Sequence, residues 1–214
     1  AGSFSPRVSI VYRLGGTGAS IRGSAYGGFR APTLNELYRG FRVGNTVTNP
    51  NDALTPERLK AAEGGLLFGR GRVSARATGF WNILDDSIVN VTLATSPSLN
   101  IRQRQNADKL RAAGVELEAD LRLPHSMSVG ATTAIIDSRF KGDTNLRDYH
   151  PPQVADYNVG LNVRYDNAIW LVSGQLRVTG PQYEDDLNTL LLRRATVLDL
   201  IGRPTLANRG SGFV

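Results

Sequence analysis

Four arginines and three aromatic residues are the side chains of this 214-residue chain that are best suited to binding an anionic molecule. A guanidinium group forms paired hydrogen bonds with carboxylate-like oxygens and stacks on aromatic rings. The seven residues lie in polar stretches: Tyr38, Arg39, Phe41 and Arg42 in the first, Arg102 and Arg104 in the second, and Tyr183 in a third. The combination predicts loops that bind an anionic, polycyclic ligand. Packing of the loops themselves is the alternative role for each residue.

Catalysis and metal binding find less support in the residue pattern. Glu116 and Glu118 share one strand face, but no nucleophile, base and orienting residue converge with them, so we expect no enzyme and no cofactor. Cys is absent, and neither His125 nor His150 has a second His or Cys at ligand spacing, so no zinc site is expected. The carboxylates at 184–186 could hold Ca²⁺, although adjacent carboxylates in a solvated loop need no metal.

The net charge of +6 does not predict a nucleic-acid partner, because the basic residues are scattered along the chain rather than clustered. The glycine-rich stretches 16–18 and 69–71 complete no phosphate-binding pattern and open no helix, so they are interpreted as hairpin turns.

The elements that must position these side chains are strands, because apolar and polar residues alternate with a period of two. Val8, Ile10 and Tyr12, for example, alternate with Ser9 and Val11. About nine such segments are expected, at 7–14, 19–29, 59–68, 73–83, 114–123, 127–136, 157–165, 168–178 and 194–200.

The connections between the segments alternate between short and long. Short turns contrast with long polar excursions after Phe29, from Ala94 to Lys109, from Asp137 to Asp156, and through Tyr183. Bacterial outer-membrane barrels have short periplasmic turns and longer extracellular loops, whereas a soluble sandwich has more even spacing. No apolar run reaches the length of about 18 residues that a spanning helix needs. The chain is therefore predicted to be all-β, an antiparallel transmembrane β-barrel.

Aromatic residues fall at two heights along the predicted strands, as the interfacial girdles of such a barrel require. One set lies beside the short turns and the other lies about nine or ten residues away, roughly the length of one membrane crossing. The first set is Tyr12, Phe68, Tyr165 and Trp170, and the second is Phe29, Trp81 and Tyr157.

One stretch carries a family resemblance. Residues 26–38 read YGGFRAPTLNELY, and LTPE at 54–57 and EGGL at 63–66 follow. This succession resembles the barrel of TonB-dependent outer-membrane transporters. The similarity extends from Phe4 to Leu200, with further matches at 80–88, 102–108, 114–118, 152–154 and 182–186.

The resemblance implies a 22-stranded barrel in the bacterial outer membrane, blocked by an N-terminal plug. It implies import of a scarce ligand, a ferric siderophore or cobalamin, with energy passed to the plug by the TonB complex. Outer-membrane lipid and lipopolysaccharide would surround the barrel, and contact with lipopolysaccharide phosphates is a further alternative for the loop arginines.

Residues 1–214 are expected to be one partial barrel domain that lacks the plug, with the closing strands incomplete after 200 and no transport by this piece alone. Two other functions stay open. The first is a passive porin-like or structural outer-membrane barrel, and the second is a secreted sandwich-type adhesin.

Overall fold

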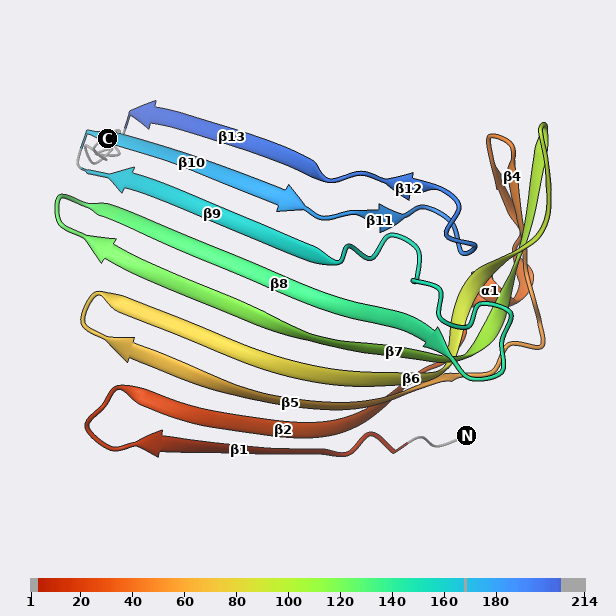
Figure 1. Ribbon diagram of the computed structural model, residues 1–214, viewed down its shortest axis with the longest axis horizontal. Helices are drawn as coiled ribbons and strands as arrows, with labels where there is room; N and C mark the ends of the chain where they lie inside the picture. The colour runs from red at the N-terminus through yellow and green to blue at the C-terminus, as the bar shows by residue number, and fades with distance from the viewer. Residues whose placement is uncertain (1–3, 168, 205–214) are drawn as a thin grey trace, which may run out of the picture.

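A single curved sheet dominates the computed structural model, which describes residues 4–167 and 169–204 (Figure 1). Nine strands follow one another across it, each antiparallel to the next. They are β1 (Arg7–Leu14), β2 (Ala19–Arg30), β5 (Glu57–Arg70), β6 (Val73–Ser96), β7 (Leu99–Leu123), β8 (Met127–Lys141), β9 (Tyr157–Asp166), β10 (Trp170–Thr179) and β13 (Ala195–Pro204). The predicted all-β class and the number of barrel strands are confirmed.

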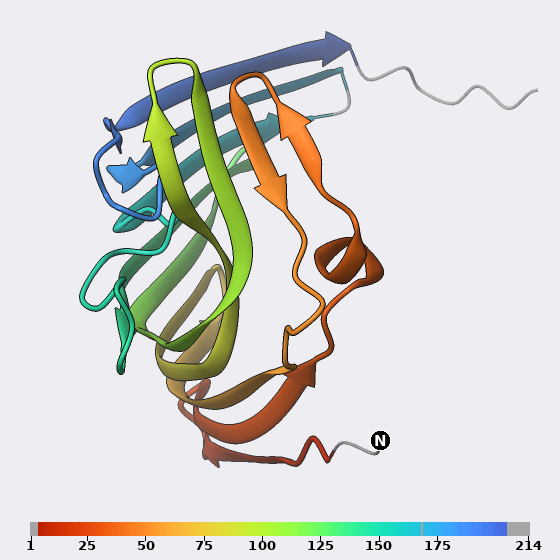
Figure 2. The same cartoon turned by 90° about the vertical axis from the view of Figure 1, so that its right-hand side faces the viewer.

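The sheet bends into an open trough that runs from β1 at one margin to β13 at the other (Figure 2). The short turns after β1, β5, β7 and β9 all lie at one end of the trough, and the long connections lie at the other (Figure 1). In a barrel of this kind the short-turn end is periplasmic. The long-connection end is therefore called the extracellular rim below.

Alternation along β5 separates the two faces of the trough. Arg58, Lys60 and the even-numbered residues up to Phe68 are exposed, whereas the residues between them are buried or half-buried up to Leu67. Curvature explains the difference, because side chains on the concave face crowd together. Hydrogen bonds across that face join Ser24 to Glu63 at 2.8 Å. The concave face is the polar lumen wall, and the convex face carries the exposed apolar side chains.

The predicted aromatic positions fall on the convex face. Residues paired in register point to the same face of the sheet. Trp81 is paired with Ala62, and Phe68 lies on β5 with Ala62, so both rings share the face of Leu66 and Leu117. Trp81 is 44% exposed and Phe68 is 40% exposed. Large apolar rings held in the open on one face fit a surface that contacts lipid.

The predicted excursion from Ala94 to Lys109 is wrong. β6 and β7 stay paired far beyond the barrel wall and form a long hairpin whose last pair is Ser96 and Leu99. β-branched residues favour this extended form. Within β6, Asp86 adopts a left-handed backbone conformation, with a φ of +58°. Polarity alone suggested a loop. Rim segments half-bury the hairpin over most of its length through largely polar contacts, so no regular alternation of apolar and polar residues marks it as a pair of strands.

The first excursion contains structure of its own. It holds α1 (Leu34–Tyr38), β3 (Phe41–Val43) and β4 (Thr46–Asn49). β4 pairs with β3 and also with β7, and the pairing with β7 is parallel, from Thr46–Asn100 to Asn49–Gln103. The two hairpins therefore stand side by side as one small sheet above the rim (Figure 2). β11 (Gln182–Tyr183) and β12 (Leu191–Leu192) form a short ribbon in the last excursion.

Several predicted boundaries shift. β8 continues to Lys141, and β10 begins at Trp170. β13 reaches Pro204, so the strand continues beyond the predicted end at 200. The predicted incomplete closing strands fall partly at 205–214, outside the described residues. No helix within residues 4–167 and 169–204 is long and apolar enough to cross a membrane.

Candidate functional site

Arg30, the last residue of β2, connects several segments at the extracellular rim through ion pairs. Its Nε donates to Glu57 at 2.5 Å and its Nη1 donates to Glu36 at 3.0 Å. Glu36 also closes a capping box with Thr33, which starts α1 directly after Pro32. Glu57 is buried, and its other oxygen accepts a hydrogen bond from the Ile88 N–H at 2.7 Å. One arginine thus joins β2, α1, β5 and β6 at the rim.

Asparagines fasten the first excursion to the projecting hairpin. Asn106 accepts from the Thr55 N–H at 2.9 Å and donates to the carbonyls of Thr55 and Asp86. Asn51 donates to the Arg104 carbonyl at 3.0 Å. The amide side chains bond backbone N–H and C=O groups that have no neighbouring strand to pair with, so the irregular backbone keeps its hydrogen bonds.

Arg104 lies at the centre of this assembly. Its guanidinium group stacks over the Phe41 ring at 5.1 Å from the ring centre. It also donates to the carbonyls of Asn35 and Arg39, at 2.8 and 3.1 Å, where α1 ends. A cation at a helix C-terminus is favoured by the exposed carbonyls. The Arg104 guanidinium and the Phe41 ring thus stack on each other within the protein, which is the loop-packing alternative for these two residues.

A polar cavity of about 530 Å³ opens beside Arg104. Residues from α1, the projecting hairpin and the last two excursions line it, namely Thr33, Asn35, Glu36, Ile88, Val89, Asn90, Arg102, Arg104, Pro152, Gln153, Glu184 and Asp186. Arg102 is half-buried in this wall, and its Nε is buried without a hydrogen-bond partner. An anionic group in this cavity could accept a hydrogen bond from the Arg102 Nε, which is a buried donor on a cation and otherwise lacks a partner.

The acidic residues of the cavity are already engaged. Asp186 is buried and accepts from the Thr92 N–H and hydroxyl at 2.7 and 2.6 Å. Gln153 donates to Glu184, with both oxygens 3.2 Å away. Asp186 therefore holds the last loop against β6, Glu184 joins that loop to Gln153 of the preceding excursion, and the cation of Arg102 is the group left for a ligand.

Backbone and hydroxyl donors of its own loop, rather than a metal ion, surround the carboxylate of Asp185 in the acidic cluster. Its carboxylate accepts from the Thr189 N–H, the Thr189 hydroxyl and the Leu190 N–H at 2.7 to 3.1 Å. Burial alone would raise its pKa, but these hydrogen bonds, with that from Leu190 foremost, outweigh burial and lower it. Within the described part of the chain, no group of three or more His, Cys, Asp or Glu residues could hold a metal ion.

The structure brings only some of the predicted residues together. Arg102 and Arg104 line the cavity, and Arg39 and Phe41 touch Arg104. The remaining three lie outside the lining. Tyr38 is 68% exposed at the end of α1, Arg42 donates to the Gly44 carbonyl at 2.9 Å, and Tyr183 packs its ring against His150.

Sequence reasoning missed Glu36, Asn90 and Gln153 as lining residues. Glu36 carried a readable signal, since Thr33 followed three residues later by a Glu is a capping box. Asn90 had no such signal, because its position depends on the hairpin that the polar composition concealed.

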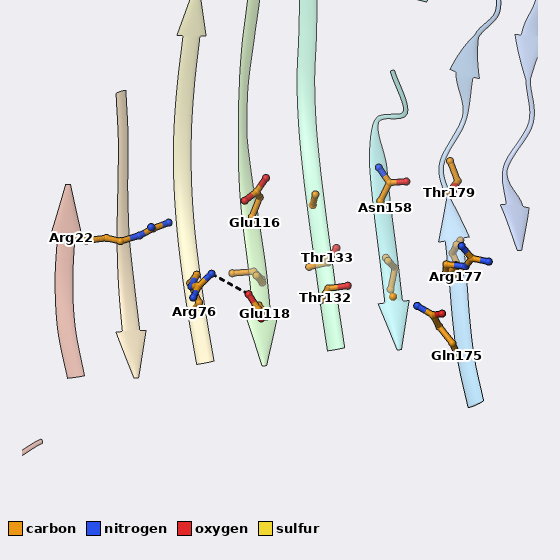
Figure 3. Close-up of a pocket in the computed structure, with 15 residues that line it drawn as sticks. Arg22, Arg76, Glu116, Glu118, Thr132, Thr133, Asn158, Gln175, Arg177 and Thr179 are labelled. Atoms are coloured by element: carbon orange, nitrogen blue, oxygen red, sulfur yellow. Dashed lines mark ion pairs between the residues drawn. The ribbon is translucent and has the colours of Figure 1, made fainter. Parts of the chain in front are cut away.

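A second cavity, of about 420 Å³, lies against the lumen wall (Figure 3). Cations and carboxylates project from four strands of the wall there, with Arg22 on β2, Arg76 on β6, Glu116 and Glu118 on β7, and Arg177 on β10. Arg76 and Glu118 form an ion pair at 3.4 Å, and Arg22 donates to Thr78 at 2.9 Å. This wall can dock a polar, mixed-charge surface inside the barrel.

Comparison with known proteins gives one family. Residues 1–208 match the family model described as TonB dependent receptor-like, beta-barrel. A curated relative, the ferrichrome outer membrane transporter/phage receptor of Escherichia coli, is 31% identical over 107 residues, which cover 48% of this chain and 14% of that protein.

Solved structures share the fold at lower identity. The copper transporter OprC is similar with a TM-score of 0.73 at 20% identity, over 92% of this chain and 30% of that chain. The ferric yersiniabactin uptake receptor FyuA of Yersinia pestis is similar with a TM-score of 0.71 at 22% identity, over 95% of this chain and 30% of that chain. The chain thus spans about a third or less of the length of these proteins.

Proposed function

Because this chain belongs to the TonB-dependent receptor β-barrel family, we propose that it forms part of the barrel wall and extracellular rim of a receptor that actively imports a ferric siderophore. The family and its relatives place the chain in the outer membrane, and the relatives are named as transporters and receptors rather than enzymes. The observation that carries the proposal is the rim cavity with the unsatisfied Arg102.

Ligand capture at the rim is supported by the chemistry of the cavity. Arg102 supplies a half-buried cation whose Nε has no partner, and Arg104, held by Phe41 and two backbone carbonyls, adds a second positive charge to the lining. Ferric siderophores present clustered anionic oxygens around the metal, which planar guanidinium groups bind in pairs. Cobalamin has fewer such oxygens, so we propose it as a weaker candidate for this site. Tyr38, Arg42 and Tyr183 lie outside the lining and would meet a ligand only at its margin.

Active transport requires a plug and coupling to the TonB complex, and the lumen wall supports that part of the proposal. Arg22, Arg76 and Arg177 line the second cavity together with the carboxylates of Glu116 and Glu118. A folded plug with its own mixed charges could dock there and be released by modest force, since exposed ion pairs are individually weak.

The binding test uses the intact receptor that contains this chain. Its affinity for ferric enterobactin, ferric yersiniabactin, ferrichrome and cyanocobalamin is measured by fluorescence quenching. We expect one ferric complex to bind tightest, and we expect Arg102→Gln to weaken it about tenfold. Arg70→Gln, which removes the same charge at the short-turn end, should leave the affinity unchanged. An unaltered affinity in Arg102→Gln would overturn the assignment of this cavity.

A passive porin-like barrel is the second candidate, because charged and polar side chains line the second cavity on the lumen wall. A porin would admit small solutes at a rate proportional to their concentration. Swelling of liposomes that contain the intact receptor separates the two, since a plugged receptor should admit no sugar.

A further inference from the structure

The charges that line the rim cavity balance one another. Two cations and three carboxylates belong to its lining, namely Arg102, Arg104, Glu36, Glu184 and Asp186. Arg30, just outside the lining, offsets Glu36, because its Nη1 lies 3.0 Å from the Glu36 carboxylate. The described lining therefore presents two cations and two unpaired carboxylates, with no excess of positive charge.

Neither Glu184 nor Asp186 is neutralised by a neighbouring cation. Among the residues that the structure describes, no Lys, Arg or His nitrogen lies within ion-pair distance of either carboxylate. Their side-chain oxygens accept from uncharged donors, Thr92 for Asp186 and the Gln153 amide for Glu184. Asp186 is 1% exposed, so water and salt screen its charge poorly.

The two arginines differ in what they can still offer a ligand. Arg104 donates through Nη1 to the carbonyls of Asn35 and Arg39, and its guanidinium group stacks on Phe41. Arg102 is half-buried, and its Nε has no hydrogen-bond partner. One free cationic donor therefore borders the cavity beside two carboxylates that no cation offsets.

Neutral hydrogen-bonding groups complete the wall. Asn35 and Asn90 are exposed in the lining, and their side-chain amides form no hydrogen bond within residues 4–167 and 169–204. A free amide both donates and accepts, so it suits the carbonyl and amide groups of a polar ligand. The wall thus offers several neutral contacts and one cationic contact.

Ferric siderophores differ in net charge according to the groups that hold the metal. Each hydroxamate group carries one negative charge, so three of them balance the ferric ion and give a neutral complex. Each catecholate group carries two, so three of them leave a trianionic complex. A trianion that enters a partly buried cavity beside two carboxylates loses water and meets strong repulsion, whereas a neutral complex escapes most of both costs.

We propose that Glu184 and Asp186 make this cavity selective for a ferric complex without net charge, of the tris-hydroxamate class. The Arg102 guanidinium donates to the oxygen atoms around the metal, which keep partial negative charge in a neutral complex. The amides of Asn35 and Asn90 bond the remaining polar groups of the ligand. The inference rests on the uptake of a ferric siderophore in the proposed function and specifies its chemical class.

The test measures ligand binding to the intact receptor, purified in mild detergent, by fluorescence quenching. The probes are ferrichrome and coprogen, which are neutral tris-hydroxamate complexes, and ferric enterobactin, which is a trianionic tris-catecholate complex. We expect one of the neutral complexes to bind about tenfold more tightly than ferric enterobactin. Its affinity should stay within about twofold when the salt concentration is raised, because a neutral ligand has no net charge for salt to screen.

A charge variant tests the role of the carboxylates directly. Glu184→Gln removes one negative charge and keeps an oxygen that can accept from Gln153. We expect this variant to bind ferric enterobactin about tenfold more tightly than the wild type, with the affinity for the neutral complex within about twofold. Asp52→Asn removes the same charge from an exposed turn outside the lining and should leave both affinities unchanged. Equal affinity of Glu184→Gln and the wild type for ferric enterobactin would overturn the inference.

The ranking of the probes by the wild-type receptor keeps the two proposals apart. Tighter binding of ferric enterobactin than of both neutral complexes would overturn the selectivity and would leave siderophore uptake standing. Binding of none of the three ferric complexes would contradict the proposed cargo itself. This ranking needs no variant, so it decides the question even if Glu184→Gln does not assemble.

Discussion

Arg30 supplies the strongest prediction at the level of a single residue. Its partner Glu57 is buried, so removing the cation leaves a carboxylate with the Ile88 N–H as its remaining hydrogen-bond partner. We expect Arg30→Gln to destabilise the intact barrel by about 2 kcal/mol, since an uncompensated buried group carries its desolvation cost. Heat-induced unfolding followed by gel mobility measures this change. The exposed control Arg70→Gln should unfold like the wild type, and an unchanged Arg30→Gln would contradict the role given to this network.

Glu36 makes the rim sensitive to acid. Partial burial would raise its pKa, but hydrogen bonds from Thr33 and Arg30 outweigh burial and lower the pKa below its usual range. A lowered pKa means that the stabilisation is fully present above the ordinary value of about 4.3 and is lost as the pH falls through the folded-state value. The stability difference between the wild type and Glu36→Gln should therefore be constant above about pH 5 and should shrink in stronger acid. A difference that grows with acidity would contradict this assignment.

At the level of elements, the loop at 184–190 is held against β6 by Asp186. Both carboxylate oxygens accept hydrogen bonds from Thr92. Asp186→Asn places an amide donor against one of these donors, so the contact should open while the barrel stays assembled. Hydrogen exchange of the Thr92 and Leu190 amides should accelerate, with no change in the strands of the wall. Asp52→Asn, in an exposed turn, should show the wild-type exchange.

Sequence alone predicted the strands of the wall because alternation there reflects two different surroundings. β1 follows the predicted bounds, Arg7–Leu14, and β9 differs by one residue. The hairpin of β6 and β7 beyond Asp86 was hidden because the rim segments that half-bury it make largely polar contacts, which removes the alternation. The parallel pairing of β4 with β7 could not be read either, since it joins residues more than 50 positions apart through backbone atoms.

Only part of the rim cavity could be predicted, again because residues distant in the sequence meet there. Residue type singled out Arg102 and Arg104, but the lining residues Glu36, Gln153 and Asp186 come from distant segments. Aromatic residues chosen on type alone, Tyr38 and Tyr183, lie outside the lining. Residue type alone does not place a side chain in the cavity, and α1 and the ribbon of β11 and β12 place these two rings outside it.

At the level of the whole molecule, the two faces of the wall predict opposite responses to the same substitution. Leu117 lies on the convex apolar face, and Glu116 lies on the lumen wall. Leu117→Arg should cost about 2 to 4 kcal/mol at mid-depth in the bilayer. Glu116→Arg should cost far less, because its side chain stays in water. Yields of folded, heat-modifiable receptor in the outer membrane measure both, and equal yields would contradict the assignment of the faces.

Import driven by the TonB complex is the central claim about the whole molecule. It is tested most directly by uptake of ⁵⁵Fe bound to the tightest-binding siderophore, in cells that carry the intact receptor with and without a functional TonB protein. The account predicts that iron accumulates in the first strain, that accumulation stops without TonB while surface binding persists, and that Arg102→Gln reduces both binding and uptake. Uptake that continues at the same rate without TonB would contradict it and would favour a passive porin-like barrel.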